Sequence, residues 1–319
     1  MNNAYLYRRV VQWDAETIDL LDRIGKDNPF STAGFARAMQ ALGREIWIIS
    51  SHGDEVPAGS ALGFVCRQKL AAELEFVSIP MVARSSEFWR TVESLVGRER
   101  ITDITVSSFA SPEFELPPLP GEVSRRTRQE YLLPLEASEL PGLLSSNHKR
   151  NAKKAEKAGI TIRRGSEYPG WIEHHIALME HSAERRVARG ESVSMAGSMN
   201  DYRAYLQHGA AELFQAMRDT EVLSSVLVLK SPLSAYYHSA GTNPDGMSLG
   251  ASHFLIHSIS KHLQAEGFSQ FNLGGAAEGS SLARFKQGFG PNVVVVPAAA
   301  CHVGPAWKKY VRHAIRKLR

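Results

Sequence analysis

The chain has 319 residues, of which 43% are hydrophobic and 22% charged, and its formal net charge is +4. This length suits two domains of ordinary size, and the composition excludes a fibrous protein and a chain that is disordered throughout. No run approaches the roughly 20 apolar residues that span a bilayer. Cys66 and Cys301 lie in apolar runs outside any CxxC pair, which predicts buried core residues and argues against a zinc site or a disulfide framework. We therefore expect a cytoplasmic protein with no bound metal.

The first part of the chain predicts mixed α and β structure. Apolar and β-branched runs indicate strands at 46–50, 61–66, 73–80 and 101–108, with a helix at 86–96. Four prolines and Gly121 within 112–121 interrupt this pattern, because proline continues neither a helix nor a central strand. A strand follows at 125–135. We place the first lobe at 1–135 and the second at 136–319.

The second lobe predicts helices followed by an antiparallel meander. Helices are expected at 145–158, 170–189 and 199–208, a short strand at 160–164, and three consecutive strands at 211–219, 222–230 and 234–242. A helix at 250–266 then leads to a buried strand at 268–275. This helical crossover predicts parallel pairing and a crevice where the strand ends separate.

A glycine-rich stretch follows that last strand, NLGGAAEGSSLARFKQGFG at 272–290. Gly274 and Gly275 permit positive φ and a close approach of a donor to the backbone. A helix start near Ser280 offers free N–H groups to an anion or a developing oxyanion. The alternative is a tight structural turn that leaves Lys286 solvated.

With its F-K-x-x-F-G element at Phe285 to Gly290, the chain resembles the FemAB-like and related GNAT-type acyltransferases. Other family-like pieces occur in the expected order: Asn28-Pro29-Phe30-Ser31-Thr32, His148-Lys149-Arg150-Asn151 with Ala155 and Gly159, and Arg185. The resemblance implies an α/β fold of two tandem GNAT-like lobes. It also implies that Phe285 and Lys286 hold the acyl donor and stabilise its negative charge, with Arg185 and Arg284 among the substrate-binding residues.

The resemblance implies an N-acyltransferase that uses a carrier-linked acyl group as co-substrate and holds no permanent cofactor. An ordinary acetyl-CoA site has a Q/R-x-x-G-x-G/A turn, and here that position reads Met247 to Ser252, where Gly250, Ala251 and Ser252 are the candidate donor-binding residues. Acyl-CoA and aminoacyl-tRNA both remain open as donors. The acceptor is expected to be the amine of a polar small molecule or a cell-envelope precursor, with tRNA as a possible partner and DNA not expected.

His238 lies on the strand beside the predicted crevice, where an imidazole would take the proton from an attacking ammonium. A core histidine with satisfied ring nitrogens is the alternative. Strand alternation puts Tyr236, a further substrate-binding candidate, on the same face as His238 and Tyr237 on the opposite face, so all three are not expected to face one pocket.

The stretch from 149 to 164 carries seven basic residues and one acid, Glu156. Lys149, Arg150 and Lys153 are the candidates for binding an anionic part of the substrate, because cations near a helix start oppose the helix dipole. A solvated helix face is the alternative. The same stretch supports a different class of function, a catalytically silent protein that binds tRNA, a nucleotide-sugar or another polyanion.

Overall fold

The computed structural model describes residues 6–50, 60–79, 86–112, 114–136, 143–165, 170–190 and 197–305. The chain divides into two compact units, unit 1 with residues 1–129 and 294–319, and unit 2 with residues 130–293. The boundary placed between residues 135 and 136 stays a prediction about two lobes. The two compact units do not follow this boundary, because residues from 294 onward, which include most of the last strand, belong to unit 1.

Unit 1 contains a three-stranded meander followed by a helix and a parallel strand. Its elements are β1 (Leu6–Arg9), α1 (Ala15–Ile24), the 3-10 helix η1 (Pro29–Ser31), α2 (Ala33–Ala41), β2 (Glu45–Ser50), β3 (Ser60–Gln68), β4 (Ala71–Phe76), α3 (Ser86–Arg98), β5 (Asp103–Val106), the first part of β6 (Glu122–Pro134) and β12 (Asn292–His302). The strand order is β1-β2-β3-β4-β5-β12-β6. Strands β2, β3 and β4 pair antiparallel, and β5 pairs parallel to β4. The predicted strands and the helix at 86–96 are confirmed, while the turn expected at 51–59 lies outside the described residues.

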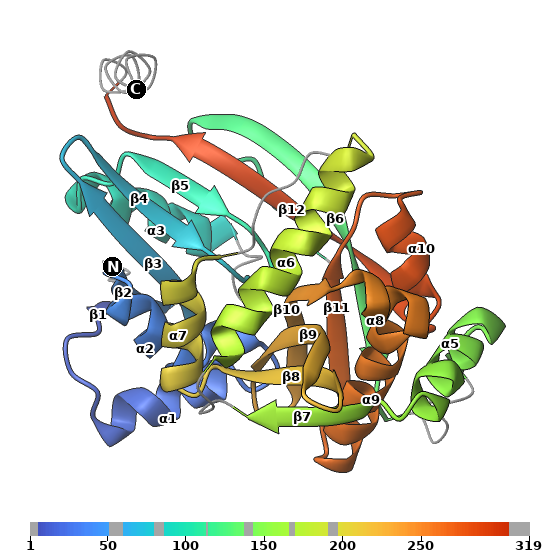
Figure 1. The fold of residues 1–319 in the computed structure, drawn as a ribbon. Helices are drawn as coiled ribbons and strands as arrows, with labels where there is room; N and C mark the ends of the chain where they lie inside the picture. Colours follow the sequence, from blue (N-terminus) through green and yellow to red (C-terminus); the bar gives the residue numbers. More distant parts are fainter. Residues whose placement is uncertain are drawn as a thin grey trace. The chain divides into compact units, whose positions relative to one another are not determined.

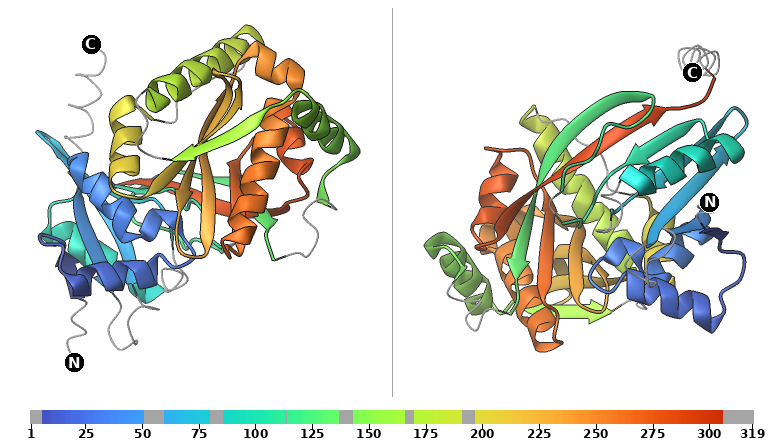
Figure 2. Two further views of the ribbon diagram at one scale, coloured as in Figure 1. Left: turned by 60° about the horizontal axis from the view of Figure 1, so that its bottom comes forward. Right: turned by 180° about the vertical axis from the view of Figure 1, so that it is seen from behind.

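The sheet of unit 1 is covered on both faces (Figure 2). Helix α3 buries Phe88 and Trp89, whose rings meet Phe76 of β4 edge to face at 5.8 and 5.6 Å. On the other face, Phe35 of α2 contacts Phe64 of β3 in the same way at 5.6 Å. Each such pair contributes about 0.5–1.5 kcal/mol beyond its buried area. Unit 1 therefore has a core of its own.

Unit 2 repeats the order of meander, helix and parallel strand (Figure 1). Its elements are α5 (Ser146–Lys157), β7 (Thr161–Gly165), α6 (Trp171–Ala188), α7 (Met199–Gln207), β8 (Ala211–Arg218), β9 (Glu221–Lys230), β10 (Ser234–Thr242), α8 (Pro244–Leu249), α9 (Ala251–Ala265), β11 (Gln270–Gly275), α10 (Ser281–Gln287) and the last part of β6. The strand order is β6-β11-β10-β9-β8-β7. Strands β8, β9 and β10 pair antiparallel and β11 pairs parallel to β10, which confirms the predicted crossover.

Helices α6 and α9 cover opposite faces of the unit 2 sheet. The predicted apolar face of α9, with Leu255, Ile256, Ile259 and Leu263, is buried together with Val226 and Val228 of β9. Burying each such side chain stabilises the fold by about 1.5–3 kcal/mol. The alternate residues of β9 face α6, where Ser225 contacts His175. Because both faces are covered, β9 is buried along most of its length.

Helix α6 passes very close to β10 at Gly241. A Cβ atom built on Gly241 lies 2.1 Å from the carbonyl carbon of Leu178 and 2.3 Å from the amide nitrogen of Met179. Both atoms are helix backbone, which cannot move aside as a side chain does. Glycine is therefore required here for α6 to cover the end of β10.

Two smaller expectations concern cysteine burial and membrane crossing. Cys301 is buried, whereas Cys66, near the end of β3, is only half-buried. The expectation for Cys66 is therefore wrong, because the burial of β3 fades over its last residues. No helix within the described ranges is long and apolar enough to cross a membrane.

Candidate active site

A cavity of about 500 Å³ lies in unit 2 where β10 and β11 part. The two strands pair at three positions only, the last of them Tyr236 with Asn272. Beyond this point β10 continues as far as Thr242 without a partner residue on β11, so its backbone lines the opening. The lining residues come from α6, β10, α8, the start of α9, the end of β11 and α10.

Many of the predicted site residues line this cavity. They are Lys286, Phe285, His238, Tyr236, Arg185, Ser252, Gly274 and Gly275. Their roles stay predictions. The fold brings these residues together from α6, β10, α9, α10 and the end of β11. Arg186 of α6 and Arg189, directly after this helix, also line the cavity and were not anticipated.

The strand β10 bulges at His238. Tyr237 pairs with Val228 of β9, and Ser239 pairs with the adjacent Leu227, so His238 is the extra residue. A bulge interrupts the alternation of side chains along a strand. The expectation that Tyr236, Tyr237 and His238 do not all face one pocket is wrong, because all three line the cavity. Tyr236 and Tyr237 still alternate regularly against β9, and both line the cavity because it opens at the edge where β10 loses its partner β11.

Lys286 is the charged group buried at the centre of the site. Its side chain is only 4% exposed, and Nζ donates a hydrogen bond of 2.8 Å to the carbonyl oxygen of Gly275. The rings of Tyr237 and Tyr131 have their centroids 5.6 and 6.0 Å from Nζ. Burial lowers the pKa of the Lys286 ammonium to about 7, and the nearby Glu130 carboxylate opposes this shift. The lysine is thus poised to gain or lose charge near neutral pH.

Gly274 shapes the backbone opposite this lysine. It has a φ of +74°, in the left-handed region that favours glycine, and it lies in a register shift between β11 and β6. Its amide donates 2.8 Å to Oδ1 of Asn272, and a Cβ on Gly274 would be 3.6 Å from Nζ of Lys286. Glycine at this position turns the chain so that the next carbonyl, that of Gly275, meets the ammonium.

Glu130 is a site residue that the sequence reasoning missed. Its carboxylate is fully buried and accepts hydrogen bonds from Oη of Tyr236 at 3.2 Å and from Nδ2 of Asn272 at 2.8 Å. A buried charge is kept only where hydrogen bonds or counter-charges compensate it. The signal in the sequence was an acid directly before the apolar run YLL in a strand. Glu130 supports the Tyr236 phenol and the strand end near Lys286.

His148 is a second residue whose position the sequence did not assign. Its ring is 4% exposed, Nε2 lies 2.8 Å from the carbonyl oxygen of Phe285, and Nδ1 lies 3.0 Å from Oγ of Ser145. Burial lowers the pKa of His148, so the neutral ring donates from Nε2 to Phe285. A Cβ on Gly288 would be 2.0 Å from Cε1 of His148, which shows how closely α10 sits on this ring. His148 thus ties α5 to the helix that carries Phe285 and Lys286.

The ring of His238 lies among tyrosines. The ring centroids of Tyr205 and Tyr202 are 5.4 and 6.3 Å away. A second histidine of unit 2, His175, is a satisfied core residue, because its two ring nitrogens lie 2.9 Å from the hydroxyls of Ser225 and Ser239. Burial lowers the pKa of His175 to about 3, so its ring is neutral. His238 lines the cavity, and its role as proton acceptor stays a prediction.

The start of α9 borders the cavity. Gly250 joins α8 to α9 with a φ of +78°, and Ser252 lines the cavity, whereas Ala251 is fully buried. The first N–H groups of a helix have no partner within it, and they attract anions. A Cβ on Gly250 would be 2.5 Å from the carbonyl oxygen of Asn151, so this glycine also permits α5 to pack on α9.

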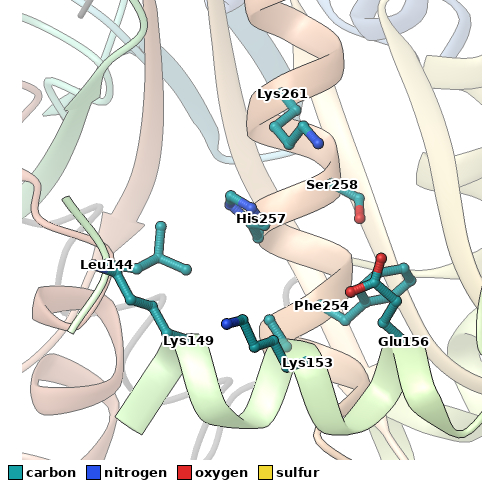
Figure 3. A pocket seen from close by; sticks show the side chains of 9 residues that line it. Leu144, Lys149, Lys153, Glu156, Phe254, His257, Ser258 and Lys261 are labelled. Atoms are coloured by element: carbon teal, nitrogen blue, oxygen red, sulfur yellow. The ribbon is translucent and has the colours of Figure 1, made fainter. Parts of the chain in front are cut away.

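The predicted substrate-binding cations separate into three places. Arg185 lines the cavity and donates to the carbonyl oxygen of Thr242 at 2.7 Å, which holds the end of β10 against α6. Arg284 is exposed on α10, where it donates to the carbonyl oxygen of Gly279 and does not line the cavity. Lys149, Arg150 and Lys153 lie on α5, also outside this cavity. Lys149 and Lys153 line another cavity, between α5 and α9 (Figure 3).

Comparison with known families gives the class of this fold. The profile of the acetyltransferase (GNAT) domain family matches residues 144–287, which include every lining residue of the cavity. No curated protein sequence matches the chain. The matched segment belongs to the GNAT acetyltransferase domain family.

Solved structures extend the similarity to nearly the whole chain. The crystal structure of FemX superposes with a TM-score of 0.66 at 12% identity, covering 92% of this chain and 96% of FemX. L-PGS from Bacillus licheniformis gives a TM-score of 0.55 at 12% identity, covering 95% and 96%. A tandem GNAT protein from the clavulanic acid biosynthesis pathway gives 0.54 at 12% identity, covering 95% and 100%.

Together these comparisons support the resemblance found in the sequence. The mixed α/β fold with two GNAT-like lobes is confirmed. Residues 144–287 thus match the GNAT acetyltransferase domain family, and the chain as a whole has a fold similar to that of FemX. Its donor and acceptor do not follow from these similarities.

Proposed function

We propose that the chain transfers an acyl group from a carrier-linked donor to the amine of a polar acceptor, in the cavity between β10 and β11. The observation that carries this proposal is the placement of Lys286. Its ammonium is almost fully buried beside the edge of β10 that has no partner on β11, and among the described residues no carboxylate lies within ion-pair distance of it. A buried ammonium without an ion-pair partner is costly, and a negative charge that develops during the reaction compensates that cost.

In the proposed reaction the acceptor amine attacks the acyl carbon of a thioester or ester. A C–N bond forms, the carbonyl oxygen becomes an oxyanion, and the Lys286 ammonium stabilises it. His238 accepts the proton that the attacking nitrogen loses. The C–S or C–O bond to the carrier then breaks, the leaving group takes up the proton held by His238, and the amide is released. No covalent enzyme intermediate is required once both substrates are oriented.

The remaining lining residues serve to hold the donor. Phe285 offers an apolar surface, the separated end of β10 offers backbone hydrogen bonds, and the start of α9 attracts an anionic group of the carrier. Arg186 and Arg189 add positive charge on the facing helix. We propose acyl-CoA as the co-substrate, with no permanently bound cofactor. The cytoplasmic location predicted from the sequence stays part of this proposal.

A second candidate is transfer of an aminoacyl group from tRNA to a peptide or cell-envelope precursor. The exposed basic face of α5, with Lys149, Arg150 and Lys153, favours it, because nucleic-acid phosphates bind such surfaces. Parallel assays with acyl-CoA and with aminoacyl-tRNA distinguish the two donors.

Lys286→Met tests the proposed chemistry. Methionine keeps the length of the side chain and removes its charge, so we expect kcat and kcat/KM to fall together by about 100-fold or more. Lys69→Met, at an exposed turn in unit 1, is the matched control and should leave turnover unchanged. If Lys286→Met turns over within a few-fold of wild type, the role of Lys286 is wrong. If the wild type transfers from neither donor yet binds tRNA, the chain is the silent polyanion-binding protein.

A further inference from the structure

The cavity between α5 and α9 is separate from the reaction cavity. It has a volume of about 450 Å³ and is lined by Leu144, Lys149, Ala152, Lys153, Glu156, Phe254, His257, Ser258 and Lys261. Successive residues of a helix are turned by about 100°. On α9, His257 and Lys261 therefore lie on roughly the opposite side of the helix from Ser252, which lines the reaction cavity. The two cavities thus flank the same helix.

Positive charge converges on the α5–α9 cavity from both helices. Lys149 and Lys153 extend from α5, and Lys261 extends from α9 (Figure 3). Within the described part of the chain none of these three lysines has a carboxylate within 4 Å or a side-chain hydrogen bond. Glu156, the acid in the lining, is seven residues from Lys149, about 10 Å along the helix. It therefore leaves the Lys149 end of the cavity positive.

The charge pattern of α5 works against the helix itself. Lys149 and Lys153 are four residues apart, as are Lys153 and Lys157, and like charges at this spacing repel. The first turn contains no acid to complement the helix dipole. A helix gains nothing in stability from this arrangement, whereas an anionic ligand would be held by it.

The floor of the cavity has a different character. Leu144, Ala152 and the ring of Phe254 form an apolar surface beside the ring of His257. Nδ1 of His257 is buried and has no hydrogen-bond partner among the described residues. An apolar floor with ring faces, a buried polar nitrogen and three ammonium groups at the rim matches a heterocycle joined to phosphate, because bases stack on rings and phosphates pair with lysine.

We propose that the α5–α9 cavity binds a nucleotide, with Lys149, Lys153 and Lys261 on its phosphate groups and Phe254 and His257 beside its base. This inference rests on the proposed function, because a carrier-linked donor has its nucleotide part remote from the acyl group and needs a second site for it. The nucleotide belongs either to coenzyme A or to RNA. A lipid surface fits less well, since a planar membrane does not enter a space between two helices.

The test compares three proteins in binding titrations. The cavity variant combines Lys149→Gln, Lys153→Gln and Lys261→Gln. The control combines Lys26→Gln, Lys69→Gln and Arg203→Gln, which removes the same charge at exposed positions elsewhere. Each protein is titrated with coenzyme A, with deacylated tRNA and with phosphatidylglycerol vesicles at several salt concentrations. Melting temperatures of all three are measured, so that a loss of binding can be told apart from a loss of folding.

We expect the Kd of coenzyme A or of tRNA to rise by about tenfold or more in the cavity variant and to stay nearly unchanged in the control. If tRNA is the ligand, the slope of log Kd against log salt should also fall, by about 0.7–0.9 for each lost phosphate contact. An effect confined to coenzyme A identifies its nucleotide as the occupant, and an effect confined to tRNA identifies RNA. Lys153→Arg, which keeps the charge, should retain most of the binding.

The inference is overturned if both nucleotide ligands bind the cavity variant as they bind wild type, if neither binds wild type, or if only vesicle binding changes. Lys286→Met separates this result from the proposed chemistry. That variant should bind the nucleotide ligand normally while losing turnover. Normal turnover in Lys286→Met together with weak binding by the cavity variant would refute the proposed chemistry and leave the nucleotide site standing.

Discussion

Replacing Lys286 by methionine should stabilise the folded protein, and this gain should depend on pH. Burial lowers the pKa of the Lys286 ammonium from 10.5 to about 7, against the pull of Glu130. Because the pKa in the folded state is below that in the unfolded state, the charged lysine disfavours folding. The cost is fully present below about pH 7 and disappears as the pH rises toward 10.5, where the unfolded chain also loses its proton. Methionine removes this cost.

The size of the effect follows from the displacement of the pKa. Each pH unit of displacement corresponds to about 1.36 kcal/mol. Moving the pKa from 10.5 to about 7 therefore corresponds to a cost on the order of 5 kcal/mol below neutral pH. Relaxation around the ammonium reduces this figure, so it is an upper value. Part of the gain is offset because the carbonyl of Gly275 loses its hydrogen bond from Nζ, typically about 0.5–1.5 kcal/mol.

Urea denaturation of wild type, Lys286→Met and the exposed control Lys69→Met measures the effect without any knowledge of donor or acceptor. The free energy of unfolding of wild type should rise relative to Lys286→Met by several kcal/mol between about pH 7 and pH 10. Lys69→Met should follow the wild-type curve. An equal difference between wild type and Lys286→Met at both ends of this range would refute the reasoning, since it would mean that folding does not desolvate the ammonium.

Three further predictions concern positions that support the site. His148→Ala should lower kcat at least several-fold with little change in KM, because the carbonyl of Phe285 loses its hydrogen-bond donor and α10 loses its contact with α5. His148→Gln, which keeps a donor, should recover part of the rate. If steady-state kinetics of both variants match wild type, His148 does not position α10. Gly241→Ala should lower the free energy of unfolding by about 3 kcal/mol or more, because its Cβ meets the backbone of α6; a thermal melt within a degree of wild type would contradict the close approach. His175→Asn should lower the free energy of unfolding at neutral pH. This difference from wild type should shrink as the pH falls from about 6.5 toward 4. The reason is that His175, with a pKa of about 3 in the folded state, stays neutral while the histidine of the unfolded chain gains a proton, which destabilises folded wild type. Denaturation curves whose separation stays constant over that range would show that His175 is not held neutral.

Much of unit 2 was predictable because its elements follow local rules. The apolar face of α9 repeats at helical spacing, and Gly267 ends the helix, with the amide of Phe268 bonded back to Leu263. The three strands of the meander are separated by short turns, so each pairs with its neighbour in sequence. The element F-K-x-x-F-G also lies in one short stretch, which allowed Phe285 and Lys286 to be selected without knowing the fold.

Other features depend on contacts between residues far apart in the chain. The last strand, β12, pairs with β5 and so belongs to unit 1. Nothing in the sequence of β12 indicates that its partner strand lies almost 200 residues earlier in the chain. The bulge at His238 arises from the register between β10 and β9, so the side-chain alternation read from the sequence does not hold at His238. The basic helix α5 indicated an anion site, but its partners on α9 are about 100 residues away.

By itself the sequence determined the order of the elements, the resemblance to GNAT-type acyltransferases and the lysine on which the proposed chemistry rests. These follow from periodicity, turn residues and a short motif, all of which act over a few neighbouring residues. The tertiary structure alone decided that Lys286 is buried with a carbonyl as its partner, that the Glu130 carboxylate lies near enough to act on it, and that His148 holds its helix. Burial and hydrogen-bond partners are set by packing between distant segments, and desolvation, which displaces the pKa of Lys286, exists only once those segments have closed around it.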